Sequence, residues 1–309
     1  MLGKNQVECP QSLLRAARSS APLRTAIVNA GAAVVMESAY DAASAGVIEP
    51  VFFGDSDAIQ KYASELNWDI SGYEVIESGD EQSAAIAAAS AASGGDVAAV
   101  MKGHIHTDVF MRALLSRNAN LRTERRLTHV FHMTVPGREG QLLLTDCAVN
   151  IHPDVETKKA VIQNAVDLAH ALGIEKPKVA LLSATEEQME QMPSSIEAKL
   201  LTDWARDSVK SADVFGPLAM DLALSADAAR TKGVDHPVAG HADIIVVPDI
   251  VTGNALFKMM VHYMNACAAG IGLGAKVPIL LTSRADPPAA RLASAALAAI
   301  VKNHGDQSA

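Results

Sequence analysis

Four polar residues follow an apolar run, residues 279–281, near the end of the chain: Thr282, Ser283, Arg284 and Asp286. Ser283 offers a hydroxyl donor and acceptor, Arg284 a permanent cation whose fork fits phosphate or carboxylate, and Asp286 a proton acceptor. A short apolar run that ends in a turn is typical of a buried parallel strand, and open α/β sheets bind ligands beyond the carboxyl ends of such strands. The segment therefore predicts either a catalytic edge or an ordinary connection in which Asp286 caps the next helix.

Three other predicted strands also end in polar loops. These loops are residues 102–108, 146–150 and 248–254. In the first loop, Gly103 permits close backbone approach, and Thr107 can cap the following helix, on which Arg112 faces either a cleft or solvent. Four such loops together predict a cleft for a ligand that carries phosphate.

Other kinds of site fit the sequence less well. The glycines at 270–274 follow a predicted helix and precede a strand, the reverse of a dinucleotide fingerprint, so we interpret them as a helix C-terminal cap and loop. His104 and His106 lie two residues apart without a cysteine pair at ligand spacing, so we predict no metal site. Cys147 is interpreted as a buried small residue and not as a nucleophile. No Ser-His-Asp order favours a covalent mechanism.

Strand and helix patterns alternate along the chain. The predicted strands are 25–28, 50–53, 73–76, 97–101, 130–134, 142–145, 178–183, 243–247 and 277–281, and the longest predicted helices are 32–45, 81–92, 157–172 and 255–268. Such alternation predicts an α/β protein with parallel-rich sheets flanked by helices. Strands 130–134 and 142–145 have no helix between them, which indicates a hairpin and a lobe boundary near residue 130.

Composition limits the partners. The chain has 309 residues, 49% of them hydrophobic, and a net charge of −9, which disfavours nucleic acid and anionic membranes. Its three cysteines are an odd number without close pairing, and residues 1–10 lack the apolar core of a signal peptide. We therefore expect a cytoplasmic protein.

The chain resembles the phosphate acetyl/butyryltransferase family, which makes acyl phosphates from acyl-CoA and inorganic phosphate. The resemblance lies in an ordered set of segments that begins at about residue 25. The segments are 101–108, 122–126, 145–151, 172–174 with 177–180, 216–221, 248–249 with 252–254, and 281–286. The 101–103 and 282–286 segments look closer to the butyryltransferase branch, and to the transferase half of fusions with an enoyl-CoA hydratase.

The resemblance implies two α/β lobes of the isocitrate/isopropylmalate dehydrogenase architecture with the active site between them. We place the first lobe at residues 1–130 plus 270–309 and the second at 131–269. It also implies homodimers or larger homo-oligomers, and a reversible, direct acyl transfer in a ternary complex without a cofactor. Coenzyme A thioester and phosphate are then substrates.

The expected catalytic residues are Ser283, Arg284 and Asp286. The expected substrate-binding residues are Lys102, His106, Thr107, Arg112, Asp146, Asn150, Gly253 and Asn254. In typical acetyltransferases of the family the carboxylate base lies seven residues after the serine, where this chain has Ala290, so Asp286 is the nearest carboxylate. There are two alternatives. One is a dehydrogenase of the related fold, and the other is a catalytically idle protein that binds CoA or phosphate. The preferred acyl group stays open.

Overall fold

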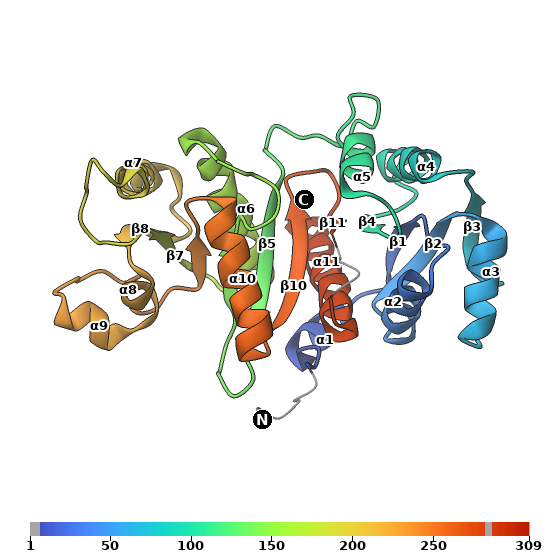
Figure 1. The fold of residues 1–309 in the computed structure, drawn as a ribbon, viewed down its shortest axis with the longest axis horizontal. Helices are drawn as coiled ribbons and strands as arrows, with labels where there is room; N and C mark the ends of the chain where they lie inside the picture. Colours follow the sequence, from blue (N-terminus) through green and yellow to red (C-terminus); the bar gives the residue numbers. More distant parts are fainter. Residues whose placement is uncertain (1–6, 282–285, 309) are drawn as a thin grey trace. The chain divides into compact units, whose positions relative to one another are not determined.

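The computed structural model describes residues 7–281 and 286–308. The chain divides into two compact units (Figure 1). Unit 1 comprises Met1–Arg125 with Ala269–Ala309, and unit 2 comprises Arg126–Ala268.

Unit 1 is a mostly parallel sheet with helices on both faces. The strands are β1 (Leu23–Val28), β2 (Ile48–Gly54), β3 (Glu74–Glu77), β4 (Ala99–Lys102), β10 (Cys267–Leu273, which begins just before the unit boundary) and β11 (Ile279–Leu280). Their order is β3-β2-β1-β4-β11-β10, and β10 alone in this set runs antiparallel to its neighbour β11. The helices are α1 (Gln11–Ala17), α2 (Ala33–Ser44), α3 (Ser56–Glu65), α4 (Glu81–Gly94), α5 (Thr107–Leu114) and α11 (Pro288–Ser308). Helices α1, α2 and α11 pack together on one face, and α4 and α5 cover the other (Figure 1).

Unit 2 repeats this plan. Its strands are β5 (Thr128–Thr134), β6 (Leu142–Thr145), β7 (Lys178–Leu182), β8 (Asp213–Leu218) and β9 (Ile244–Val246), in the order β5-β6-β9-β7-β8. Its helices are α6 (Val155–Ala171), α7 (Pro193–Ser208), α8 (Met220–Leu224), α9 (Ala226–Thr231) and α10 (Ile250–Met264). Strands β6, β9, β7 and β8 are parallel, and β5 pairs antiparallel with β6 as the predicted hairpin. The predicted α/β class with a parallel-rich sheet is confirmed.

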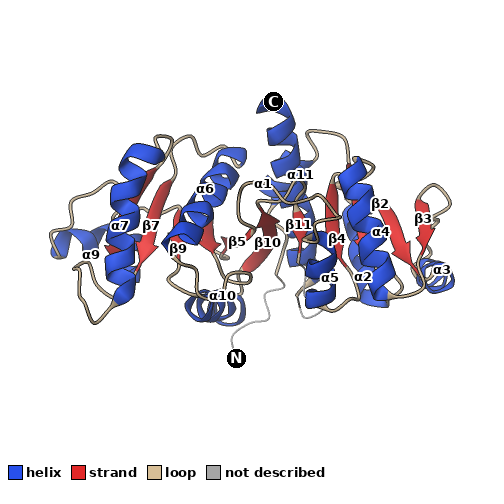
Figure 2. Cartoon of the chain, turned by 90° about the horizontal axis from the view of Figure 1, so that it is seen from above, coloured by secondary structure: helices blue, strands red, loops and turns tan. Residues whose placement is uncertain are grey.

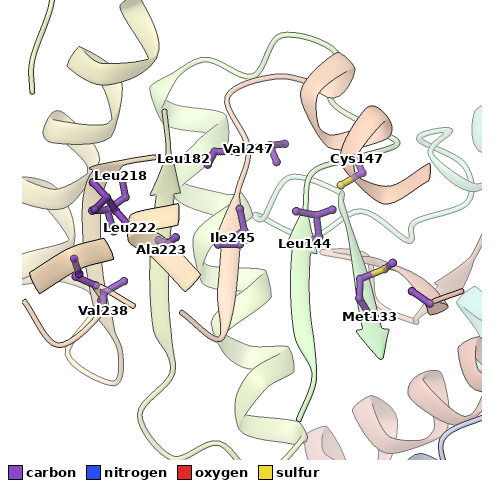
Figure 3. Packing of buried hydrophobic residues seen from close by; sticks show 14 of the residues in the cluster. Met133, Leu144, Cys147, Leu182, Leu218, Leu222, Ala223, Val238, Ile245 and Val247 are labelled. Carbon is purple, nitrogen blue, oxygen red and sulfur yellow. The ribbon is translucent and has the colours of Figure 1, made fainter. Parts of the chain in front are cut away.

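Side-chain alternation along the unit 2 strands builds a core on each face of the sheet. Leu144 and Ile245 belong to the buried cluster beneath α8, α9 and α10 (Figure 3). Their strand neighbours Leu143 and Ile244 are also fully buried and point the other way, toward the face that α6 and α7 cover (Figures 1 and 2). Both faces are therefore covered, and polar groups from these strands can reach solvent at the sheet edges.

The structure corrects two interpretations of the chain near β10 and shows a further strand in unit 2. The predicted helix 255–268 is wrong at both ends, because α10 spans Ile250–Met264 and ends on Asn265 in the left-handed region (φ 52°). The glycines at 270–274 are not a helix cap and loop, since Cys267–Leu273 is a strand. Strand β8 was not expected at all.

Candidate active site

Strands β4 and β11 bring two of the predicted loops to one edge of unit 1. They are parallel neighbours, with Leu280 opposite Met101. The carboxyl ends of β4 and β11 therefore lie side by side at one edge of the sheet. The predicted catalytic residues Ser283 and Arg284 belong to the segment after β11 but lie outside the described residues.

The loop after β4 is held against its own unit. Gly103 is buried, and a Cβ there would lie 2.1 Å from the carbonyl oxygen of Val28, so the predicted close backbone approach is confirmed. Thr107 does not cap α5, because the N-cap position is His106 and its side chain makes no capping bond. Instead the carboxylate of Glu81 accepts a hydrogen bond from the backbone N–H of His106 (3.0 Å) and contacts its Nδ1 (3.0 Å). The backbone N–H of His106 also lowers the pKa of Glu81.

The two predicted cationic residues of this region differ in setting. Lys102 is half-buried at the end of β4. The Arg112 side chain is exposed on α5 and its Nη2 lies 3.2 Å from Oδ2 of Asp108, one turn earlier. Exposed pairs of this kind add little stability, so the Arg112 guanidinium can exchange Asp108 for an anionic substrate.

Asp286 emerges half-buried just before α11. Its backbone carbonyl accepts a hydrogen bond from Nη1 of Arg291 (2.6 Å). Arg291 itself is buried. Sequence reasoning missed Arg291, although an arginine at a core-facing position of an alanine-rich helix was a usable signal. The buried guanidinium of Arg291 therefore holds the backbone carbonyl of Asp286 just before α11.

Strands β6 and β9 bring the other two predicted loops together in unit 2. They are parallel neighbours, with Thr145 opposite Val246. Asp146 opens the first loop and is buried. Its carboxylate accepts hydrogen bonds from the backbone N–H groups of Ala148 and Val149 (3.0 Å each) and from Nδ2 of Asn150 (2.7 Å). Asp146 thus organises the loop from inside.

Asn150 links that buried carboxylate to the surface. Its Nδ2 also donates to the backbone carbonyl of Leu127 (3.0 Å), and its Oδ1 accepts from Nε of Arg126 (3.3 Å). Arg126 is exposed and was quoted in the sequence analysis only as part of a motif. Arg126 and Asn150 are 24 residues apart and meet only in the folded chain, so the sequence motifs did not reveal their contact.

The first turn of α10 packs directly on the Asp146 loop. A Cβ at Gly253 would lie 2.8 Å from Sγ of Cys147 and 2.9 Å from Cγ2 of Val247, so only glycine fits without a shift. Asn254 is half-buried beside it. Cys147 is a fully buried free thiol, and burial raises its pKa. The interpretation of Cys147 as a buried small residue is therefore confirmed.

One buried histidine touches the same loop from β5. The backbone N–H of His129 donates to Oδ2 of Asp146 (3.3 Å). Burial lowers the pKa of His129 to about 4, while the nearby Asp146 acts in the opposite direction. His129 is therefore neutral at pH 7.

Unit 2 also contains a hollow away from the Asp146 loop. A cavity of about 510 Å³ lies where β7 and β8 begin, at the opposite edge of the sheet from the Asp146 loop. Its lysines are paired with carboxylates: Lys176 with Asp213 (2.7 Å) and Lys199 with Asp203 (2.5 Å). This hollow is a solvated ion-pair surface.

Residues 7–281 and 286–308 hold no group of three or more His, Cys, Asp or Glu side chains that could hold a metal ion. Their helices include none that is both long and apolar enough to cross a membrane.

Comparison with known proteins decides the family. Residues 80–299 match the family described as "Phosphate acetyl/butaryl transferase". The chain belongs to this family. A phosphate acetyltransferase from Rhizobium meliloti is 42% identical over 93% of this chain and 92% of its own length. A phosphate butyryltransferase from Clostridium acetobutylicum is 38% identical over 86% of this chain and 89% of its own length.

A solved structure agrees with the sequence comparison. A branched-chain phosphotransacylase from Enterococcus faecalis V583 superposes with a TM-score of 0.80 at 31% identity, covering 91% of this chain and 100% of that one. The resemblance inferred from sequence is confirmed: the chain is an acyltransferase that moves an acyl group between coenzyme A and phosphate, reversibly.

Proposed function

We propose that this member of the family transfers an acetyl or butyryl group directly between coenzyme A and phosphate while both are bound. The observation that supports this most strongly is the pairing of β4 with β11. This pairing brings the start of the cationic loop after β4 and the end of β11, which precedes Ser283 by three residues in the sequence, to the same edge of the sheet. Neighbouring loops at the carboxyl edge of a parallel sheet are where such a fold binds its ligands.

The proposed chemistry needs a stabilised oxyanion. An oxygen of phosphate attacks the thioester carbonyl, so that a C–O bond forms and the carbonyl oxygen becomes a tetrahedral oxyanion. The carbonyl re-forms as the C–S bond breaks. The thiolate of coenzyme A leaves with the electron pair of that bond. Ser283 donates a hydrogen bond to the sulfur or to the tetrahedral oxyanion, and Arg284 holds phosphate and offsets the developing negative charge. Lys102, His106, Thr107 and Arg112 assist from the loop after β4 and from α5.

Asp286 is the proposed base in the reverse direction. There the thiol of coenzyme A must lose its proton before its sulfur attacks the acyl phosphate, and a nearby carboxylate accepts that proton. The hydrogen bond from Arg291 to the Asp286 backbone supports a fixed position for this segment. Arg291 is then a positioning residue that acts through Asp286.

The loops of unit 2 are proposed to bind substrate through Asn150, Gly253 and Asn254. Asp146, which we expected to bind substrate itself, is buried and bonded to its own loop, which supports a role in shaping that loop. The exposed Arg126 held by Asn150 adds a guanidinium to the same surface.

The setting of the enzyme is also a proposal. We expect a homodimer or larger homo-oligomer in the cytoplasm, with no nucleic-acid or membrane partner. The buried free thiols Cys9 and Cys147 support a reducing compartment. The net charge of −9 disfavours polyanionic partners.

Isotope exchange tests direct transfer. The enzyme is incubated with acyl phosphate and labelled inorganic phosphate, without coenzyme A. Direct transfer predicts no label in acyl phosphate until coenzyme A is added. Exchange without coenzyme A would instead require an acyl-enzyme and would overturn the direct mechanism.

Variants of the catalytic segment test the assigned roles. Ser283→Ala and Arg284→Ala should each lower kcat roughly 10²–10³-fold, the typical effect of removing one charge stabiliser. Arg284→Lys should also lower the rate, because lysine lacks the bidentate fork. Arg230→Lys is the matched control, because Arg230 lies on α9 in an exposed ion pair with Asp227. If Asp286→Ala retains near-normal rates in both directions, Asp286 is not the base.

A further inference from the structure

The hollow between α7 and the start of β8 plays no part in the proposed reaction. Its volume is about 510 Å³, and it lies at the edge of the unit 2 sheet opposite the Asp146 loop. Pockets of roughly 300–1,000 Å³ hold small organic molecules. A lone phosphate or sulfate ion would leave most of this volume empty, so the size favours a larger ligand.

Four cationic side chains line the hollow from two sides. Lys199 and Arg206 are seven residues apart on α7 and therefore lie on one face of that helix, and Lys210 follows its end. Lys176 lines the hollow from the segment before β7. Asp213 is the one carboxylate among the described residues of the lining. In a chain with a net charge of −9, this local excess of positive charge favours an anionic ligand.

The ion pairs of these cations can exchange their partners. Asp203 lies outside the lining and contacts both Lys199 and Arg206, so one carboxylate serves two cations. Nζ of Lys210 lies 3.7 Å from Oδ1 of Asp207, and both side chains are largely exposed. Exposed pairs of this kind add little stability. Phosphate oxygens can therefore replace these carboxylates with little loss of stability.

An aromatic pair lines the same hollow. The rings of Phe215 and His236 are stacked, with centroids 4.0 Å apart and an angle of 10° between their planes. Nδ1 of His236 accepts a hydrogen bond from the Val238 backbone N–H (3.3 Å), which orients the ring. Burial lowers the pKa of His236, although Asp213 acts in the opposite direction, so the ring is neutral at pH 7. Aromatic rings beside a positively charged groove are a common platform for nucleobases.

We propose that this hollow binds a nucleoside diphosphate. The diphosphate contacts Lys176, Lys199 and Arg206, and the base stacks beside Phe215 and His236. The size of the hollow, its cations and its aromatic pair all belong to unit 2. The proposal therefore does not depend on the reaction that we propose for the enzyme.

Binding at equilibrium tests the proposal. Isothermal titration calorimetry measures the dissociation constant of adenosine diphosphate while coenzyme A is present at saturation, so that the substrate site is already filled. Inorganic pyrophosphate and adenosine are titrated in the same way, because each carries one half of the proposed ligand. We expect saturable binding of one adenosine diphosphate per chain, and weaker binding of both halves. Added salt should weaken the binding of adenosine diphosphate.

Variants of the cations locate the bound diphosphate. Lys199→Gln combined with Arg206→Gln should raise the dissociation constant of adenosine diphosphate roughly tenfold, because two charge contacts are lost. Neither side chain is buried, and glutamine is a good helix former, so acyl transfer should be unchanged. Lys176→Gln, before β7, should also weaken binding. Arg230→Gln combined with Lys232→Gln is the matched control, since it removes two paired cations of unit 2 outside the hollow.

Several outcomes would contradict the site. Folded enzyme could show no saturable binding of adenosine diphosphate at millimolar concentration with coenzyme A present, or bind it only when coenzyme A is absent. The control variant could lose as much affinity as the Lys199 and Arg206 variant, which would leave only diffuse attraction between charges. Pyrophosphate could bind as tightly as adenosine diphosphate, which would mean that the aromatic pair contacts no base. Circular dichroism checks that each variant is folded.

Discussion

At the scale of single residues, Asp146 shows that a polar residue at a strand end can be buried in its own loop. The sequence marks it as a carboxylate after a buried strand. Its side chain instead turns inward, where five N–H donors surround it: the backbone groups of His129, Ala148, Val149 and Asn150, and the Asn150 side chain. The backbone conformation of the loop sets the direction of this side chain, and residue spacing in the sequence does not reveal that conformation.

Asp146→Asn should destabilise the chain. Whichever way the amide turns, its NH₂ group faces donors, so we expect the free energy of unfolding to fall by roughly 1.5–3 kcal/mol. The KM for substrates should rise as well, because Asn150 loses its partner. Denaturant unfolding and steady-state kinetics provide the measurements.

The control for that substitution is Asp154→Asn. Asp154 caps α6 by accepting a hydrogen bond from the Thr157 backbone N–H (2.8 Å), and asparagine caps helices about equally well. Its stability should be nearly unchanged. Equal effects of the two substitutions would contradict the assigned role of Asp146.

At the scale of elements, the alternation of strands and helices predicted most of the fold, and the misses have physical reasons. Strand β8 contains Gly216 and Pro217, which break strand patterns. Proline is tolerated there because β8 is the last strand of the unit 2 order. Thr202 on α7 also bonds Gly216, accepting from its N–H (2.9 Å) and donating to its carbonyl (3.0 Å).

Strand β10 was missed because five of its seven residues are Cys, Ala or Gly. Its two alanines favour a helix, and its two glycines resemble a loop. Gly272 marks a close strand contact, since a Cβ there would lie 3.2 Å from the carbonyl oxygen of Ile279. Asn265, in the left-handed conformation, was the available stop signal.

The contact between α10 and the Asp146 loop should not tolerate added volume. In Gly253→Ala the new Cβ would overlap Sγ of Cys147 and approach the Cys147 Cα at 3.0 Å, so backbone must move. We expect a loss of roughly 1–3 kcal/mol in unfolding free energy and a lower rate of acyl transfer. Gly305→Ala, in open space on α11, should be neutral or slightly stabilising. A folded, fully active Gly253→Ala would refute this packing argument.

At the scale of the whole molecule, two buried histidines predict how stability depends on pH. Burial lowers the pKa of both His129 and His132 to about 4, from 6.5 for an ordinary histidine. Between these values the unfolded chain binds protons that the folded chain cannot. The free energy of unfolding should therefore be largest above pH 6.5 and fall by a few kcal/mol as the pH approaches 4.

Histidine substitutions test that dependence. His132→Leu should flatten the decline measured by denaturant unfolding at a series of pH values, because one of the two groups is removed. His152→Leu, at an exposed position, should leave the decline as it is. An unchanged slope in His132→Leu would show that His132 does not contribute.

Sequence reasoning recovered the chemistry of the site better than its geometry. Family, reaction and the four polar loops followed from ordered motifs at strand ends, and the register pairs the four strands that precede these loops as two neighbouring pairs. Arg126 and His129 were not found, because each contacts a residue that is distant in the sequence, Asn150 and Asp146 respectively. Arg291 was not found because it is buried within α11. The roles of Ser283 and Arg284 stay predictions.

The most direct test of the account is phosphate-dependent release of free thiol. Purified enzyme is given acetyl-CoA or butyryl-CoA with and without inorganic phosphate, and thiol is measured over time. The account predicts rapid release with at least one thioester when phosphate is present, and none above background without it. Absence of phosphate-dependent release from both thioesters, with correctly folded protein, would contradict it.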